Sequence, residues 1–316
     1  MISIEEQLGI QKDTPLQSVD LQKFYISGVN LFIKREDLLH PAISGNKWYK
    51  LKYNLLEAKK NNFDTLLTFG GAYSNHIYAL ASAGKELGFN TIGIIRGEEH
   101  QPINQTLSFA KNCGMKIYYL NRTEYRMKDN PDFLDQLKIK FGNFYLIPEG
   151  GTNQFAVKGC EEILKNINIE YDSVIVPVGT GGTLAGIING IRYQRNKKAI
   201  GISVLKNAAF LKNKVSELIN SFSKNQSSSN WEIILDYHFG GYAKFNKVLL
   251  EFINEFKEKT EIQLDPIYTG KMMFGIFDLI NKEYFKKDST IVAIHTGGLQ
   301  GISGLKERFG EKLLNF

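Results

Sequence analysis

Short runs rich in β-branched and aromatic residues alternate along most of this chain with segments of helical periodicity. The runs expected as strands are 31–36, 65–69, 91–96, 116–120, 144–149, 173–178, 199–205, 232–238 and 290–295. Two apolar helix faces are spaced between them: Leu51, Leu55, Leu56 and Ala58, then Ile77, Leu80, Ala81, Gly84 and Leu87. Alternation of this kind is typical of parallel sheets covered by helices on both faces, so we expect an α/β fold.

Composition places the chain among ordinary globular proteins. It has 316 residues, of which 43% are hydrophobic and 23% charged, enough for one large or two moderate domains with a ligand cleft. Its longest apolar candidate, 174–188, contains Pro177 and four glycines, so no segment reaches the roughly 18 residues of a membrane span. The N-terminus carries acidic residues where a signal peptide would be basic. We therefore expect a cytoplasmic protein with no membrane contact.

Cysteine and charge usage exclude several classes of site. Cys113 and Cys160 are too few for a disulfide scaffold or a four-cysteine zinc site, and we expect both to be buried apolar residues. No His, Cys and carboxylate spacing predicts a metal site. The net charge is 39 − 33 = +6, but the basic residues are scattered, which disfavours nucleic-acid binding and still suits a small anionic ligand. The low-complexity segment 223–230 is expected to be a surface loop.

A glycine-rich turn, 178–186, follows one expected strand and opens a helix. Its central residues are Gly179, Thr180, Gly181, Gly182 and Thr183. Glycines let the backbone fold around an anion, and the free N–H groups of a helix start bind phosphate. The turn lacks the Gly-Lys-Ser/Thr of a P-loop and the third glycine of a dinucleotide-binding turn. It predicts a phosphate site, with a tight turn that binds nothing as the alternative.

A second turn, 44–54, places Lys47 and Lys50 three residues apart near the beginning of a helix, where they share a face. Two neighbouring ammonium groups repel each other, and desolvation lowers the pKa of an amine further. Such an amine can form a Schiff base while its neighbour holds a phosphate. A solvated surface pair is the alternative that the spacing alone also allows.

A third turn, within 69–88, ends a strand with two glycines and opens a helix with Ser74, Asn75 and His76. Hydroxyl, amide and imidazole groups beside unpaired backbone N–H groups predict a carboxylate site. N-capping by Ser74 alone would also explain the motif, and His76 could be structural.

Two further segments, 267–275 and 294–301, place a threonine beside a glycine where a loop meets a helix. Ligands of open α/β sheets bind at such turns.

These elements, in this order across 34–301, closely resemble the pyridoxal-phosphate (PLP) enzymes of the tryptophan-synthase β-subunit fold type. The nearest branch contains D-cysteine desulfhydrase and 1-aminocyclopropane-1-carboxylate (ACC) deaminase. The resemblance implies two domains of open, twisted parallel sheets with helices on both faces. Residues 1–52 and 149–316 would form a large PLP-binding domain and residues 53–148 a small one. It also implies a homodimer and a small amino-acid substrate.

The resemblance assigns a role to each motif. Lys47 would carry the cofactor as a Schiff base and, once released, move the substrate α-proton. Asn75 would bind the pyridoxal 3′-oxygen, and Thr296 would lie near the ring nitrogen. The residues that would hold the phosphate are Lys50, Gly179, Thr180, Gly181, Gly182 and Thr183. The residues that would contact the substrate are Ser74, Asn75, His76, Tyr268 and Thr269, with Ser74 and Tyr268 also near the reacting atoms.

Two positions bear on the substrate. ACC deaminases of this branch carry glutamate after the pocket tyrosine and leucine before the late Gly-Gly, whereas this chain has Thr269 and Thr296, as desulfhydrases do. The pattern favours α,β-elimination of D-cysteine to pyruvate, hydrogen sulfide and ammonia. The alternatives are an ACC deaminase, a lyase for another β-substituted amino acid, and, in a different class, a phosphate-ligand binding protein without catalysis.

Overall fold

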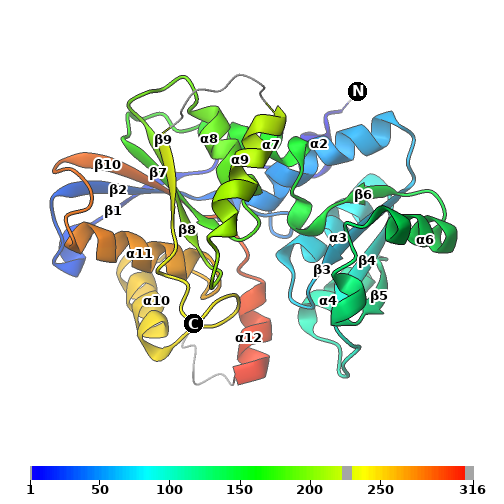
Figure 1. Cartoon of the computed structure of the whole chain (residues 1–316). Helices are drawn as coiled ribbons and strands as arrows, with labels where there is room; N and C mark the ends of the chain where they lie inside the picture. The colour runs from blue at the N-terminus through cyan, green and yellow to red at the C-terminus, as the bar shows by residue number, and fades with distance from the viewer. Residues whose placement is uncertain (1, 223–229, 310–316) are drawn as a thin grey trace.

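The computed structural model describes residues 2–222 and 230–309 and is built on two separate sheets (Figure 1). The larger sheet has the order β1-β2-β10-β7-β8-β9 and the smaller sheet the order β5-β4-β3-β6. The strands of the larger sheet are β1 (Leu16–Val19), β2 (Val29–Lys34), β7 (Ser173–Val178), β8 (Lys198–Ser203), β9 (Asn230–Ile234) and β10 (Ser289–Ile294). Those of the smaller sheet are β3 (Thr65–Gly70), β4 (Asn90–Arg96), β5 (Lys116–Leu120) and β6 (Tyr145–Ile147). Each of the nine expected runs overlaps one of these strands, although some strand ends differ by one to four residues.

One strand was not predicted. β1 pairs antiparallel with β2 at the edge of the larger sheet, while every other strand pair is parallel. Its four residues, Leu-Gln-Ser-Val, are too short to show a clear alternation of buried and exposed side chains. No element was expected before residue 31, whereas α1 (Ile4–Gln7), β1 and the 3₁₀ helix η1 (Leu21–Phe24) all precede β2.

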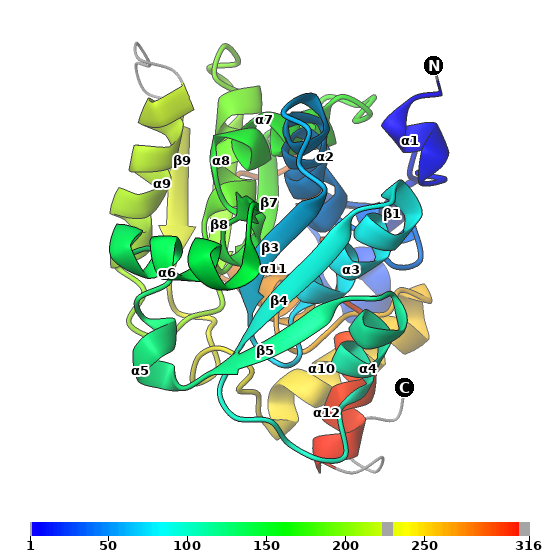
Figure 2. The ribbon, with the colours of Figure 1, turned by 90° about the vertical axis from the view of Figure 1, so that its right-hand side faces the viewer.

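Helices cover both faces of each sheet. They are α2 (Asn46–Lys60), α3 (Asn75–Leu87), α4 (Gln105–Asn112), α5 (Arg122–Tyr125), α6 (Pro131–Phe141), α7 (Gln154–Glu161), α8 (Gly182–Gly190), α9 (Phe210–Phe222), α10 (Lys247–Thr260), α11 (Thr269–Asn281) and α12 (Gly301–Phe309). Along β7, Val174 and Val176 pack into the core beneath α2, α7, α8 and α9, whereas Ile175 packs with α10 and α11. In the smaller sheet α3 and α4 lie on one face and α5 and α6 on the other (Figure 2).

Helix α2 connects the two sheets as one continuous element. The domain boundary expected between residues 52 and 53 falls inside it, although all four strands of the smaller sheet lie within 53–148. Leu51, Leu55 and Ala58 are fully buried on its inner face. Leu56 was expected there too, but it is 39% exposed, because consecutive helical residues point about 100° apart.

Other expectations meet the structure only in part. Cys160 is buried as expected, whereas Cys113 is only partly buried, and both are free thiols. Segment 223–229, expected as a surface loop, lies outside the described residues. Within the part of the chain that the structure describes, no helix is long and apolar enough to cross a membrane, and no three His, Cys, Asp or Glu residues are grouped to hold a metal ion.

Candidate active site

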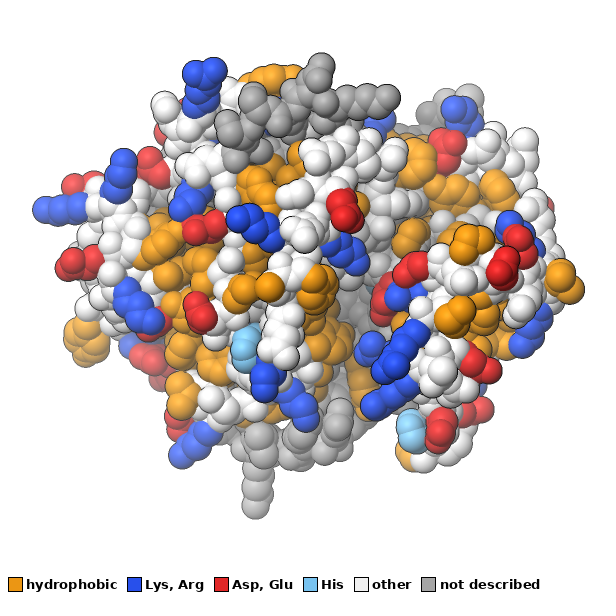
Figure 3. All heavy atoms as spheres, viewed as in Figure 1, with side chains coloured by type: hydrophobic (Ala, Val, Ile, Leu, Met, Phe, Trp, Pro, Cys, Tyr) orange, Lys and Arg blue, Asp and Glu red, His pale blue; other side chains and the backbone are white. Residues whose placement is uncertain are grey.

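A cavity of about 610 Å³, counted out to its opening into solvent, brings together the turns singled out from the sequence. Its walls come from the starts of α2, α3 and α8, the residue before α11 and the loop after β10. The surface is hollowed between the parts built on the two sheets, and Lys and Arg side chains gather nearby (Figure 3).

The start of α8 forms the anion-binding wall. Gly181 has a φ of 88°, and no side chain caps the helix, so its first N–H groups are left for a ligand. Gly179, Thr180, Gly181 and Thr183 line the cavity. Gly182 lies just behind them, and a Cβ there would come 2.9 Å from Thr152 Cγ2 and 3.4 Å from Lys50 Nζ. The turn can therefore close around a phosphate only with glycine at 182.

Lys50 supplies positive charge to this wall. Its Nζ donates to Gly150 O at 3.0 Å, to Thr152 Oγ1 at 3.1 Å and to Thr180 Oγ1 at 3.2 Å. The side chain is 3% exposed, so the two lysines are not a solvated surface pair. Burial lowers the pKa of Lys50 to about 8, which leaves it mostly charged at neutral pH.

Lys47 faces the same cavity with a more strongly perturbed amine. Burial, and then the positive charge of Lys50, lower its pKa to about 7. Its Nζ donates to Asn46 Oδ1 at 2.7 Å, and Asn46 Nδ2 donates in turn to Thr183 Oγ1 at 2.8 Å. A substantial fraction of Lys47 is thus neutral near pH 7, as a nucleophile or general base requires.

The start of α3 provides the polar wall opposite. Ser74 Oγ accepts hydrogen bonds from His76 N at 3.2 Å and Ile77 N at 3.3 Å, so Ser74 does cap the helix. Its hydroxyl hydrogen stays available, because both bonds use the oxygen as acceptor. Ser74 and Asn75 both line the cavity, where the positive end of the helix dipole favours a carboxylate.

The His76 ring lines the cavity, and one of its two nitrogens is hydrogen-bonded to another side chain. Thr68 Oγ1 donates to Ile147 O at 2.7 Å, so it accepts from His76 Nε2, which lies 2.9 Å away. Burial, and then the charges of Lys47 and Lys50, hold the pKa of His76 well below its usual range. The ring is therefore neutral, with Nε2 in a structural bond and Nδ1 buried without a hydrogen-bond partner among the residues that the structure describes.

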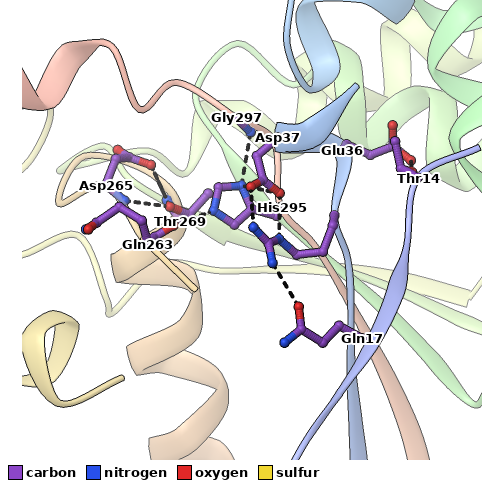
Figure 4. Close-up of polar contacts among 10 residues, drawn as sticks. Thr14, Gln17, Glu36, Asp37, Gln263, Asp265, Thr269, His295 and Gly297 are labelled. Atoms are coloured by element: carbon purple, nitrogen blue, oxygen red, sulfur yellow. Dashed lines mark hydrogen bonds and ion pairs between the residues drawn. The ribbon is translucent and has the colours of Figure 1, made fainter. Parts of the chain in front are cut away.

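Tyr268 and Thr269, adjacent in sequence, are separated by the structure. Tyr268 lines the cavity, and burial followed by the neighbouring Tyr242 raises its pKa well above the ordinary value, so the phenol keeps its proton. Thr269 does not line the cavity. Its hydroxyl donates to Asp265 Oδ2 at 2.6 Å (Figure 4), and its side chain is fully buried. In this structure Thr269 therefore does not reach the cavity, and its expected contact with a substrate stays a prediction.

Asp265 organises the start of α11, a role that the sequence analysis missed. Its carboxylate accepts the backbone N–H groups of Ile267, Tyr268 and Thr269 at 2.8, 2.7 and 2.9 Å. A carboxylate at a helix N-terminus is favoured by the helix dipole. Asp265 therefore fixes the backbone that carries the Tyr268 ring into the cavity.

Thr296 lines the cavity on a segment that buried polar residues hold in place. The ring of His295, next to it, lies 2.8 Å from Gln263 O through Nε2 and 3.5 Å from Asp37 Oδ1 through Nδ1 (Figure 4). Thr296 O accepts from Asn46 N at 3.4 Å, and any side chain at Gly45 would overlap that oxygen. The loop after β10 is thereby fastened to the start of α2.

Two other parts of the site were not predicted. Gly150 and Thr152 follow β6 in the sequence Glu-Gly-Gly-Thr-Asn, which carries the same glycine-and-threonine signal as the recognised segments 178–186, 267–275 and 294–301. Tyr242 lines the cavity from an irregular segment held by Lys271, whose Nζ donates to Gly241 O at 2.7 Å. No sequence pattern marks an isolated aromatic residue of this kind.

Two known proteins with similar sequences carry the same name. A protein of Pyrococcus furiosus named "Putative 1-aminocyclopropane-1-carboxylate deaminase" is 32% identical over 96% of this chain and 94% of its own length. A protein of Thermotoga maritima with the same name is 31% identical over 94% of this chain and 97% of its own length.

Solved structures confirm the fold. A crystal structure described as an ACC deaminase homologue superposes with a TM-score of 0.84 at 28% identity, covering 100% of this chain and 99% of that one. Threonine deaminase isoform 2 of Solanum lycopersicum, at 18% identity, shares the fold with a TM-score of 0.67 over 96% of this chain and 85% of that one. The expected PLP fold type II, with parallel sheets covered on both faces, is therefore confirmed.

The cavity matches a phosphorylated aldehyde cofactor. The uncapped glycine turn with Lys50 suits a phosphate, and the Lys47 amine, with its pKa of about 7, suits attachment of an aldehyde. The profile of the family described as "Pyridoxal-phosphate dependent enzyme" matches residues 8–297. On this match, and with a cavity suited to that cofactor, the chain belongs to the pyridoxal-phosphate-dependent enzymes.

Proposed function

We propose that the protein is an α,β-eliminating lyase that converts D-cysteine and water to pyruvate, hydrogen sulfide and ammonia. The observation that carries this proposal is the chemistry of the cavity wall. No Asp or Glu lines the cavity among the described residues, and the residue we assign to the ring nitrogen is Thr296. The wall offers cations, hydroxyls and amides to the substrate.

A neutral hydroxyl at the ring nitrogen favours elimination. When bound, pyridoxal phosphate withdraws electrons from the substrate Cα and makes its proton acidic. Thr296 stabilises a protonated ring less than a carboxylate would, so electron withdrawal is weaker. Elimination tolerates this because the thiol leaving group takes up the electrons, whereas reactions that need a long-lived carbanion do not.

Each side chain then has a defined task. Lys47 Nζ, once free, accepts the α-proton, and Asn46 Oδ1 at 2.7 Å holds it in place. Lys50 and the turn at 179–183 bind the phosphate. Ser74 and the start of α3 receive the substrate carboxylate. Tyr268, protonated at neutral pH, can donate to the departing sulfur or to the substrate carboxylate.

ACC deamination is the second candidate, because the similar proteins above carry that name. ACC has no α-hydrogen, so opening its ring requires a nucleophile or a second proton transfer near the cyclopropane carbons. Ser74 and Tyr268 are the groups in the cavity that could serve.

A lyase for another β-substituted amino acid would use the same residues as the proposed desulfhydrase. A binding protein without catalysis is disfavoured by membership in an enzyme family and by the perturbed amine of Lys47.

One assay separates these candidates. The purified, PLP-loaded protein is incubated with D-cysteine, L-cysteine, D-serine, β-chloro-D-alanine and ACC, and sulfide, pyruvate and 2-oxobutyrate are measured. We expect the fastest turnover with D-cysteine, giving equal amounts of sulfide and pyruvate. Formation of 2-oxobutyrate from ACC at a comparable rate would overturn the substrate assignment. The cytoplasmic location and the homodimer stay predictions.

A further inference from the structure

The side-chain amide of Asn75 is held between the cavity and the segment that follows β10. Gln300 Nε2 donates to Asn75 Oδ1 at 2.5 Å. Asn75 opens α3 on the smaller sheet, whereas Gln300 immediately precedes α12 in the chain that leaves the larger sheet. This hydrogen bond therefore joins the two parts of the molecule at the cavity wall.

The other end of the amide is left for a ligand. Asn75 lines the cavity, and its Nδ2 has no hydrogen-bond partner among the described residues. Gly298 approaches the amide so closely that any side chain there would overlap Nδ2, and a Cβ at Gly301 would lie 3.8 Å from Oδ1. The backbone of segment 298–301 thus passes beside the amide, with glycine at the position where a side chain would overlap Nδ2.

An amide has a donor end and an acceptor end, and turning it over exchanges them. With Oδ1 bonded to Gln300, the NH₂ group is the end that can meet a bound acceptor. We propose that Gln300 is a positioning residue that fixes the polarity of Asn75, so that Nδ2 donates to the 3′-oxygen of pyridoxal phosphate. The inference rests on the role assigned above to Asn75 in cofactor binding, and not on the identity of the amino-acid substrate.

Two replacements of Gln300 separate polarity from packing. Gln300→Glu keeps the shape of the side chain but only accepts hydrogen bonds, so it attracts the Asn75 NH₂ group and turns Oδ1 toward the cofactor oxygen. Gln300→Met keeps the length of the side chain and removes both its donor and its acceptor, so the Asn75 amide can adopt either orientation. If Gln300 only fills space, Gln300→Glu should lower the affinity for pyridoxal phosphate less than Gln300→Met does. If Gln300 sets the orientation of the Asn75 amide, Gln300→Glu should lower that affinity more.

The experiment measures the dissociation constant of pyridoxal phosphate from the apoenzyme by fluorescence titration, together with the visible absorbance of the bound cofactor. We expect affinity to fall about threefold in Gln300→Met and more than tenfold in Gln300→Glu, because two oxygens would face each other. Gln22→Glu, an exposed replacement distant in the fold with the same charge change, should bind like the wild type. Apoenzyme melting curves check that every variant is folded.

A double-mutant cycle tests whether Gln300 acts through Asn75. In an Asn75→Leu background no amide remains to be turned, so the added effect of Gln300→Glu should vanish. An undiminished effect in that background would mean that the new charge acts directly, and it would overturn the inference. Wild-type-like affinity of Gln300→Glu would also overturn it. Because none of these measurements uses D-cysteine, failure of the proposed reaction would leave this result intact.

Discussion

Lys47 Nζ donates a hydrogen bond to Asn46 Oδ1 at 2.7 Å, which joins the proposed catalytic base to the residue preceding it on α2. The same amide donates through Nδ2 to Thr183 Oγ1 at 2.8 Å, on the phosphate-binding turn. One side chain thus connects the amine and the anion site. A neutral amide at this point also adds no charge, which leaves the low pKa of Lys47 undisturbed.

The first prediction concerns the pH dependence of cofactor attachment. A lysine attacks an aldehyde only as the neutral amine, and the pKa of Lys47 is about 7. The rate at which visible absorbance appears after mixing apoenzyme with pyridoxal phosphate should therefore rise about tenfold per pH unit below pH 7 and level off above it. Stopped-flow absorbance between pH 5.5 and 9 measures this rate.

Asn46→Asp is the matched variant for that measurement. A carboxylate beside Lys47 Nζ would favour the ammonium form and raise its pKa, so the curve should move to higher pH by about one unit or more. Lys47→Arg should show no attachment at any pH. If the wild-type rate still climbed steeply between pH 8 and 9, an unperturbed lysine would be the nucleophile.

The second prediction is a stability linkage at Lys50. Its pKa of about 8 in the folded protein is below the 10.5 of an ordinary lysine, so between these values only the unfolded chain holds the proton. Relative to Lys50→Met, the wild-type apoenzyme should gain about 1.4 kcal/mol of unfolding free energy per pH unit from pH 8 to 10. Below pH 8 the difference should be constant. Urea unfolding of both proteins at each pH checks the slope, and parallel curves throughout would contradict it.

The third prediction follows from the position of Thr269. Thr269→Glu would bury a second carboxylate against Asp265, whose Oδ2 now accepts the threonine hydroxyl at 2.6 Å. An unpaired buried charge should cost on the order of 3–5 kcal/mol of unfolding free energy. Thr269→Ser keeps the hydroxyl and should cost less than about 1 kcal/mol. A fully stable Thr269→Glu protein with altered substrate preference would instead favour the sequence-based expectation that this residue faces the substrate.

Much of the fold was predictable because buried parallel strands and amphipathic helices leave strong local patterns. β7 is buried along its whole length and was expected over the same six residues. The turns were recognisable because glycines at helix starts are uncommon without a reason, and Gly182 indeed has no room for a Cβ. Lys47 and Lys50 could be paired because α2 places residues three apart on one face.

The remaining features depend on tertiary contacts that no local pattern encodes. Tyr268 and Thr269 occupy adjacent positions at a helix start, and only the packing of α11 decides which faces the cavity. Asp265 and His295 do not line the cavity but hold neighbouring segments in place through hydrogen bonds to backbone groups, which a sequence does not reveal. Tyr242 comes from an irregular segment, whose path is set by its contacts with other elements.

The last prediction concerns Thr296, assigned above to the ring nitrogen. Thr296→Asp would place a carboxylate there, favour the protonated ring and strengthen electron withdrawal from Cα. Removal of the α-proton should then become easier, while its return should compete better with loss of the thiol. We expect a severalfold rise in the ratio of α-proton exchange to sulfide release.

Proton NMR in D₂O measures the exchange, with D-alanine as a substrate that has no leaving group, and a sulfide assay with D-cysteine measures elimination. Thr296→Asn is the matched control, since it has nearly the same shape as aspartate but no charge, and it should leave the ratio close to that of the wild type. The segment that carries Thr296 is held by Asn46 N at 3.4 Å and by the His295 ring, so the new carboxylate should stay at the cavity wall. An equal ratio in the aspartate and asparagine variants would show that residue 296 does not act on the ring nitrogen, and the argument for elimination from a weak electron sink would fall with it.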